Sequence, residues 1–145
     1  MLDIAITILL GVLGGVAVGT QASIAGEMSR RVGSPASSFI VHLGGAVLSG
    51  LLLLLWGDQQ VRNWHKISWY MWGAGALGLV LYLTLGRTIP RLGAATAIML
   101  ILIGQLGIGM LIDHFGLFGL TPRHMDGSRV LAAILLISGG YLMMR

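Results

Sequence analysis

Long apolar stretches alternate with short polar segments along almost the whole chain. A helix needs about 20 apolar residues to span a bilayer, so the pattern predicts membrane helices over about residues 4–30, 35–56, 68–85, 93–112 and 127–144. Ser34 and Pro35 indicate the start of the second helix, as an N-cap followed by a proline at the first helical position. Pro90 is expected to stop any helix before the fourth one begins. We therefore expect an all-α membrane protein with five transmembrane helices in a single transmembrane domain.

Composition narrows the function classes. Apolar residues make up 56% of the chain and charged residues only 10%, far below the roughly 25% charge of soluble domains. The chain has no Cys, no nucleophile beside a base, no paired carboxylates and no phosphate-binding glycine loop, so we expect neither an enzyme nor a bound cofactor or metal. The nine Lys and Arg residues are scattered through short loops, which argues against a nucleic-acid partner.

The basic residues are almost evenly divided between the two sides of the membrane. One side receives Arg30, Arg31, Arg87, Arg91 and Arg145, and the other receives Arg62, Lys66, Arg123 and Arg129. An excess of Lys and Arg on cytoplasmic loops normally fixes orientation, and five against four is hardly an excess. We therefore predict dual topology, with the chain inserted both ways up and pairing as an antiparallel homodimer. The alternative is one orientation, set by a partner or by helix packing.

Small residues recur at helical spacing. Gly11, Gly15 and Gly19 form a row on the first helix, and Gly75 and Gly78 continue to Tyr82 on the third. Such rows let two helices approach closely inside a membrane; bending during a transport cycle is the alternative. A weak internal echo also relates residues 31–36 to residues 91–96, which suggests two helical hairpins followed by a fifth helix.

Polar side chains inside apolar spans must find partners or line a water-filled path. Gln21 and Gln105 suit recognition of an uncharged or polyfunctional molecule, or else join two helices by a hydrogen bond. Thr96, Trp72 and Tyr82 are candidates to line the same cavity, although single aromatic residues near helix ends, such as Trp72 and Tyr82, are more often interface anchors.

Four ionisable residues allow two interpretations each. His42 either relays protons or is a neutral side chain bonded to a carbonyl. Glu27 has Arg30 and Arg31 at the spacing of helix ion pairs, which favours a structural role over a coupling carboxylate. Asp113 and His114 close the fourth span, where tying a loop or helix end is favoured over metal binding.

Several short motifs follow one another in the order of a known family. They are Gln21, Ser38-Phe39, Trp72-Gly73, Leu77-Gly78, Pro90-Arg91-Leu92-Gly93-Ala94-Ala95-Thr96, Gly104-Gln105-Leu106 and Asp113-His114-Phe115-Gly116. With these motifs the chain resembles the YdcZ-like family of the drug/metabolite transporter superfamily, in its small five-helix branch. Ala25 and His42 depart from the pattern, which has an Asn and a Gly there.

The resemblance implies a multi-pass protein of the bacterial inner membrane. It also implies that each chain is half of a transporter, with two inverted five-helix units around a central cavity, four helices of each unit lining the path and the fifth lying outside. The leading hypothesis is a secondary transporter of small organic molecules that works by alternating access. A non-transporting accessory subunit and a passive channel are the alternatives.

Dual topology can be tested by cysteine accessibility, because the chain has no Cys of its own. Two variants, each with a single Cys at one end, are expressed without any partner protein. We expect the Cys of each variant to be labelled from both sides of the membrane. Labelling of each end from one side only would contradict the prediction.

Overall fold

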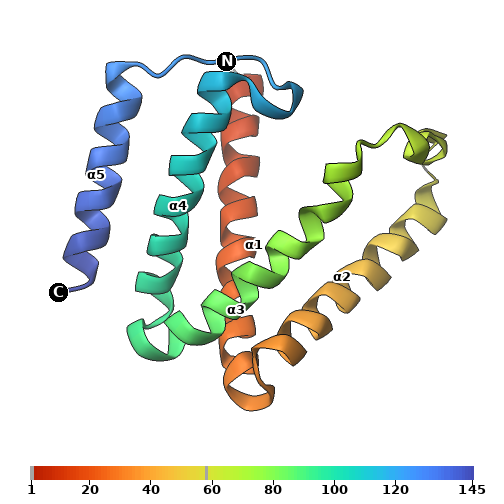
Figure 1. Cartoon of the computed structure of the whole chain (residues 1–145), viewed down its shortest axis with the longest axis horizontal. Helices are drawn as coiled ribbons and strands as arrows, with labels where there is room; N and C mark the ends of the chain where they lie inside the picture. The colour runs from red at the N-terminus through yellow and green to blue at the C-terminus, as the bar shows by residue number, and fades with distance from the viewer. Residues whose placement is uncertain (1, 58) are drawn as a thin grey trace. The chain divides into compact units, whose positions relative to one another are not determined.

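The computed structural model describes residues 2–57 and 59–145, and this part of the chain is helical with no strand. The α-helices are α1 (Leu2–Val32), α2 (Ser34–Trp56), α3 (Ala74–Leu92), α4 (Ala94–Phe115) and α5 (Gly127–Met143) (Figure 1). Three short 3-10 helices, η1 (Gln59–Lys66), η2 (Trp69–Gly73) and η3 (Leu117–Gly119), lie in the connections. The prediction of an all-α membrane protein is confirmed.

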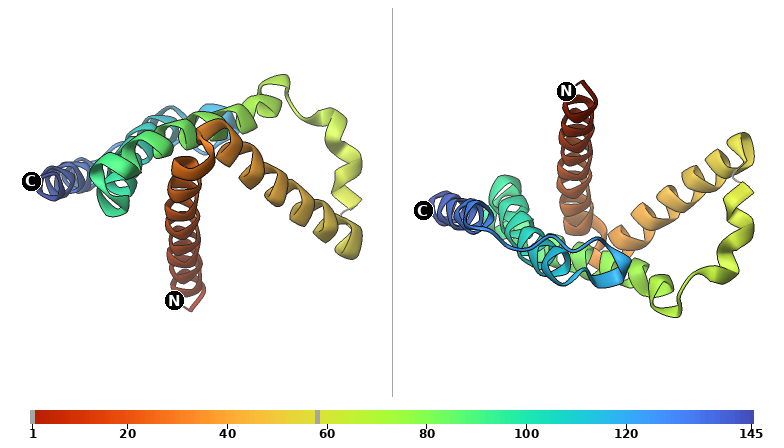
Figure 2. Two further views of the ribbon diagram at one scale, coloured as in Figure 1. Left: turned by 90° about the horizontal axis from the view of Figure 1, so that it is seen from below. Right: turned by 90° about the horizontal axis from the view of Figure 1, so that it is seen from above.

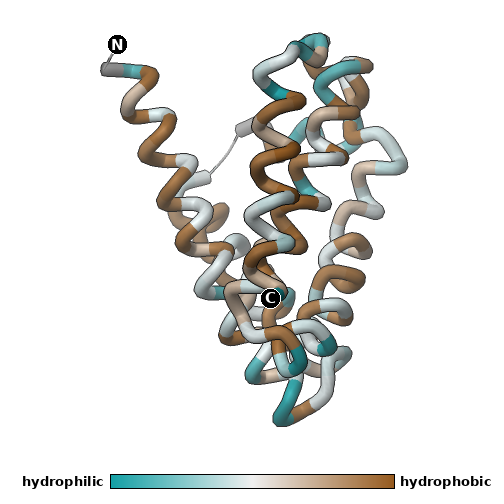
Figure 3. Tube along the Cα trace, turned by 90° about the vertical axis from the view of Figure 1, so that its left-hand side faces the viewer, coloured by the Kyte–Doolittle hydropathy of each residue, from teal (hydrophilic) through white to brown (hydrophobic). Residues whose placement is uncertain are grey.

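Hydropathy follows the helices. Four helices are long and apolar enough to cross a membrane, at Asp3–Val32, Ser34–Trp56, Trp69–Leu92 and Ala94–Phe115, and α5 is a shorter apolar helix of 17 residues. Apolar residues run along the helices, while polar residues gather near the connections (Figure 3). This arrangement suits helices that meet lipid along their length and water at their ends.

Two local expectations from the sequence are wrong. The N-cap of α2 is Gly33, so Ser34 is the first residue of the helix, Pro35 is the second, and no side chain caps the helix. Pro90 was expected to stop any helix before the fourth, yet α3 continues through Pro90 to Leu92. A proline this close to a helix end removes one backbone hydrogen bond and leaves the earlier bonds of the helix intact. The helix ends instead at Gly93, whose backbone φ of 79° is outside the helical region.

Single glycines connect two pairs of helices. Gly33, between α1 and α2, has φ 86° and ψ 151°, and Gly93, between α3 and α4, has φ 79° and ψ 162°. This region is essentially restricted to glycine. In each turn the glycine carbonyl accepts the first hydrogen bond of the next helix, from Ser37 N–H at 3.0 Å and from Ala97 N–H at 3.2 Å. Residues 31–36 and 91–96 therefore share one backbone turn.

The repeat continues into the buried residues of the flanking helices. Ala22, Ala25 and Ser37 are at most 8% exposed, and so are the residues sixty positions later, Tyr82, Leu85 and Ala97. The two hairpins therefore bury matching positions.

The contact between α1 and α3 is reciprocal. A methyl group on Gly26 would lie within 3.0 Å of the Ile89 side chain, and one on Gly86 would lie 2.9 Å from Cβ of Ser29. Gly86 and Ile89 are the residues sixty positions after Gly26 and Ser29. Equivalent residues thus meet in exchanged roles, as they do around a two-fold axis.

The chain divides into two compact units, Met1–Arg91 and Leu92–Arg145. In the first, the carboxyl-terminal ends of α1 and α3 meet the start of α2, and α1 and α2 diverge from their turn (Figure 2). In the second, α4 and α5 are joined by η3 and an extended segment. The single transmembrane domain expected from the sequence stays a prediction.

The glycine turns generate a stability prediction. Replacing Gly33 or Gly93 by Ala should lower the free energy of unfolding by about 1–3 kcal/mol, because a Cβ strains this backbone conformation. Gly104→Ala is the matched control: Gly104 is helical with open space around it, so that change should be neutral or slightly stabilising. Thermal unfolding in detergent compares the three variants, and equal effects at all three positions would contradict the prediction.

Candidate functional site

His42 is fixed by its own helix. Its Nδ1 lies 2.7 Å from the Ser38 carbonyl oxygen and 3.3 Å from Ser38 Oγ. Since a carbonyl only accepts hydrogen bonds, Nδ1 carries the hydrogen of the 2.7 Å bond. The ring is thereby oriented with Nε2 on the side away from Ser38. This is the carbonyl bond of the structural alternative, and it leaves Nε2 available for another group.

Gly78 and Tyr82 of α3 bring that helix against His42. The His42 and Tyr82 rings meet edge to face, with centroids 5.3 Å apart and planes at 72°. A methyl group on Gly78 would lie only 2.6 Å from Nε2 of His42. Gly78 therefore permits the close approach of the imidazole, and the structure brings together three residues that the sequence had singled out.

Ser29, Ser34 and Ser37 lie around the Gly33 turn, and the sequence motifs did not identify Ser29 or Ser37 as buried. Ser37 Oγ donates to the Ala25 carbonyl oxygen at 3.0 Å and is fully buried. Ser29 is also buried, and its Oγ has no hydrogen-bond partner in the described part of the chain. A methyl group on Gly86 would meet both Ser29 and Ser34. The closeness of these serines around the Gly33 turn was the signal that could have identified them.

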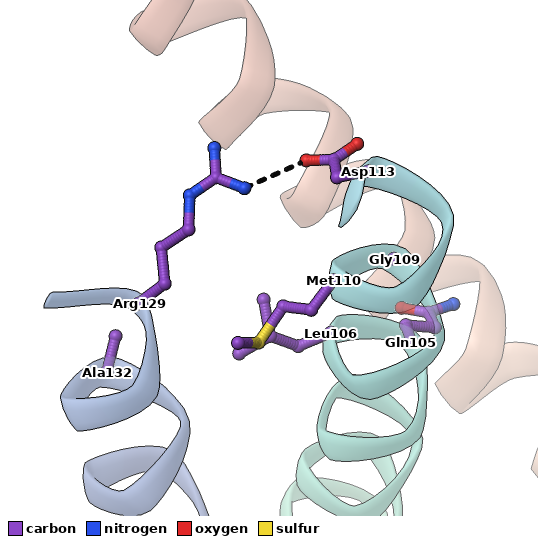
Figure 4. Close-up of a pocket in the computed structure, with 7 residues that line it drawn as sticks. All are labelled: Gln105, Leu106, Gly109, Met110, Asp113, Arg129 and Ala132. Atoms are coloured by element: carbon purple, nitrogen blue, oxygen red, sulfur yellow. Dashed lines mark hydrogen bonds and ion pairs between the residues drawn. The ribbon is translucent and has the colours of Figure 1, made fainter. Parts of the chain in front are cut away.

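In the second unit, α4 and α5 enclose a hollow of about 350 Å³. Seven residues line it: Gln105, Leu106, Gly109, Met110, Asp113, Arg129 and Ala132. Arg129 Nη1 lies 3.3 Å from Asp113 Oδ2 and closes one end (Figure 4). In this view Leu106 and Met110 point toward α5, whereas the Gln105 amide points away from it. Gln105 therefore borders the hollow with its amide directed elsewhere.

Asp113 and His114 tie down the connection between α4 and α5. The Asp113 carbonyl oxygen accepts from Arg123 N–H at 2.7 Å, and His114 Nδ1 accepts from Met125 N–H at 3.2 Å. The rings of His114 and His124 meet edge to face at 5.5 Å. Among the described residues, no group of three or more potential ligands could hold a metal ion. These bonds have the geometry of the loop-tying role.

The remaining candidates are spread over the two units. Gln21 is exposed on α1 and makes no side-chain hydrogen bond within residues 2–57 and 59–145. Trp72 meets Trp64 edge to face at 6.4 Å, and Thr96 Oγ1 donates to the Met143 carbonyl oxygen at 3.3 Å. Glu27 accepts from Arg30 and Arg31 at 2.7–2.8 Å. None of these contacts joins two of the remaining candidates for the substrate path.

Two glycines of the row on α1 face open space. A methyl group on Gly11 or Gly15 would meet nothing within 4 Å, and neither would one on Gly75 of α3. Gly19 accepts a bond from Ser23 Oγ through its carbonyl oxygen. Close packing of another helix at Gly11, Gly15 and Gly19 stays a prediction, and that helix would have to come from another chain.

Comparison with known proteins gives one match. A family model described as "Putative inner membrane exporter, YdcZ" matches residues 6–142. No curated protein and no solved structure matches the chain. The match covers all five α-helices.

The start of α5 generates a pH prediction. Asp126 Oδ1 accepts from Arg129 N–H at 2.9 Å and from Ser128 Oγ at 2.7 Å. These bonds, chiefly the one from the Arg129 backbone, hold the pKa of Asp126 below its ordinary value of 3.8. Because the folded-state pKa is lowered, the capping bond stabilises α5 fully above about pH 4. It is lost as the pH falls through the lowered pKa.

Hydrogen exchange of the Arg129 amide measures this cap. Protection should be constant down to about pH 4 and fall below it, once the intrinsic pH dependence of exchange is removed. Asp126→Ala should lose protection at every pH, whereas Asp126→Asn, which still caps, should show no such fall. An unchanged pH dependence in Asp126→Asn would assign the effect to another group.

Proposed function

Because the chain belongs to the YdcZ family of inner membrane exporters, we propose that it is a secondary transporter that works by alternating access as an antiparallel homodimer. The family match and the apolar helices support a multi-pass transporter of the bacterial inner membrane. The proposal adds the substrate class, small organic molecules, and the mode of assembly.

Polar side chains that the single chain leaves exposed carry the proposal. Gln21, His42 and Gln105 lie within apolar helices, yet all three are exposed in the isolated chain. An amide or imidazole facing hydrocarbon is costly unless it finds a partner or water. A second copy covering these helix faces would enclose the three side chains in a polar cavity. That cavity would be the substrate path.

The small size of the packed core supports an assembly of two chains. Few residues other than glycine are buried among those whose side chains are described. They are Ala22, Ala25, Tyr82, Leu85, Ala97, Ser29, Ser37 and Ser38. The open space at Gly11 and Gly15 offers a surface on which a further helix could pack closely. The nearly even loop charges favour an inverted second copy over a parallel one.

Within that cavity we assign roles by chemistry. Gln21 and Gln105 would bind polar groups of the substrate, because an amide both donates and accepts. Tyr82 and Trp72 would offer aromatic faces, to which organic cations are attracted. Thr96 would border the path through its hydroxyl group, and His42 would present Nε2.

Transport can be measured with the purified chain in liposomes. A panel of neutral metabolites and one organic cation, ethidium, should contain a compound whose flux saturates and shows counterflow. Gln105→Ala should lower that flux by about three- to tenfold, the effect of one lost hydrogen bond. Ser138→Ala is the matched control, because its hydroxyl group bonds only within α5, to the Ile134 carbonyl oxygen.

Two outcomes would contradict the proposal. Flux that never saturates and shows no counterflow would identify a channel. Absence of flux across the panel, together with a second protein that always co-purifies, would identify an accessory subunit. Equal flux in Gln105→Ala and the control would remove Gln105 from the path.

A further inference from the structure

A second hollow lies between α2 and α3, near the Gly33 turn. It measures about 460 Å³ and is lined by Ser34, Pro35, Val80, Leu83, Thr84 and Arg87. Its lining changes character along α3. Val80 and Leu83 are apolar and lie toward the middle of the helix, whereas Thr84 and Arg87 are polar and lie toward its end. The hollow is therefore amphipathic along the direction in which the helix would cross the membrane.

Arg87 has no acidic partner. No hydrogen bond, ion pair or ring contact engages its guanidinium group within the described residues, whereas Arg30, Arg31 and Arg129 each pair with a carboxylate. The repeat makes the contrast sharper, since Arg87 lies sixty positions after Glu27, the acid that Arg30 and Arg31 hold. The carboxylate of Glu27 is thus paired with arginines, whereas the guanidinium group of Arg87 lines a hollow without a carboxylate partner.

Other groups near Arg87 also favour binding of an anion. Ser34, which lines the hollow, and the buried, unpartnered Ser29 both lie against Gly86, one residue before Arg87. The first turn of α2 also begins here, and no side chain caps it, so its free N–H groups contribute partial positive charge. Hydroxyl groups and a guanidinium group together are a favourable set of donors for phosphate oxygens.

We propose that this hollow binds an anionic phospholipid, with its phosphate at Arg87 and Ser34 and an acyl chain along Leu83 and Val80. Charge complementarity selects the headgroup, because Arg87 is a cation without an acid. The apolar half selects a lipid, because a soluble anion would leave Val80 and Leu83 uncovered. Basic pockets between membrane helices bind such headgroups in general. The inference depends on membrane insertion and is independent of transport.

Native mass spectrometry of the detergent-solubilised full chain tests the site. Binding of phosphatidylglycerol is compared with that of phosphatidylcholine in the wild type, Arg87→Gln and Arg91→Gln. The wild type should prefer phosphatidylglycerol. Arg87→Gln should weaken that preference by about fivefold, corresponding to one juxtamembrane cation. Arg91→Gln is the matched control, because Arg91 is on the same helix end but does not line the hollow; it should keep the preference.

Two further arms keep the test decisive. Leu83→Trp should fill the apolar half of the hollow and weaken phosphatidylglycerol binding. Arg87→Lys should retain most of the preference for phosphatidylglycerol. If Arg87→Gln does not fold, these two variants test the site. Equal losses in Arg87→Gln and Arg91→Gln would reduce the effect to general charge attraction and overturn the site. Displacement of the lipid by inorganic phosphate alone, or unchanged binding in Leu83→Trp, would also overturn it.

Discussion

The positive φ angles of Gly33 and Gly93 are the constraint on which the helical arrangement depends. Each lets one helix follow another with a single residue between them, in a conformation that side chains resist. Such a turn leaves no polar loop to solvate and places the last turn of one helix beside the first turn of the next. In the first unit the same economy of space continues beside the Gly33 turn, where Gly26 lies against Ile89 and Gly86 lies against Ser29 and Ser34.

Away from the turns the chain is mostly uncovered. In water such a surface would aggregate, but lipid covers apolar side chains without cost. Polar side chains are different, because hydrocarbon offers them no hydrogen bonds. Exposed Gln21, His42 and Gln105 are therefore the positions at which the isolated chain is incomplete. This incompleteness, together with the exporter family, is the physical basis for proposing a second, inverted copy.

Hydropathy predicted the fold well because a membrane allows few alternatives: each long apolar segment must be a helix. Boundaries were harder. Pro90 was read as a stop, yet the glycine that follows at position 93 ends α3. The spacing of Gly78 and Tyr82 did place them on one face, and that face meets His42.

The candidate site was only partly predictable. Periodicity identifies residues on one helix face, but it does not say which face meets which helix. The buried Ser29 and Ser37 were missed for that reason, since small polar residues near a turn resemble loop residues. Gln105 was identified correctly as a polar residue in an apolar span, but its direction, away from α5, required coordinates.

The central claim is that one chain is half of a transporter whose other half is its own inverted copy. Electron cryomicroscopy of the chain purified alone into nanodiscs tests it most directly. The account predicts two copies related by an axis in the membrane plane, with Gln21, His42 and Gln105 of both copies facing a shared cavity. A closed monomer, or copies that all point the same way, would contradict it.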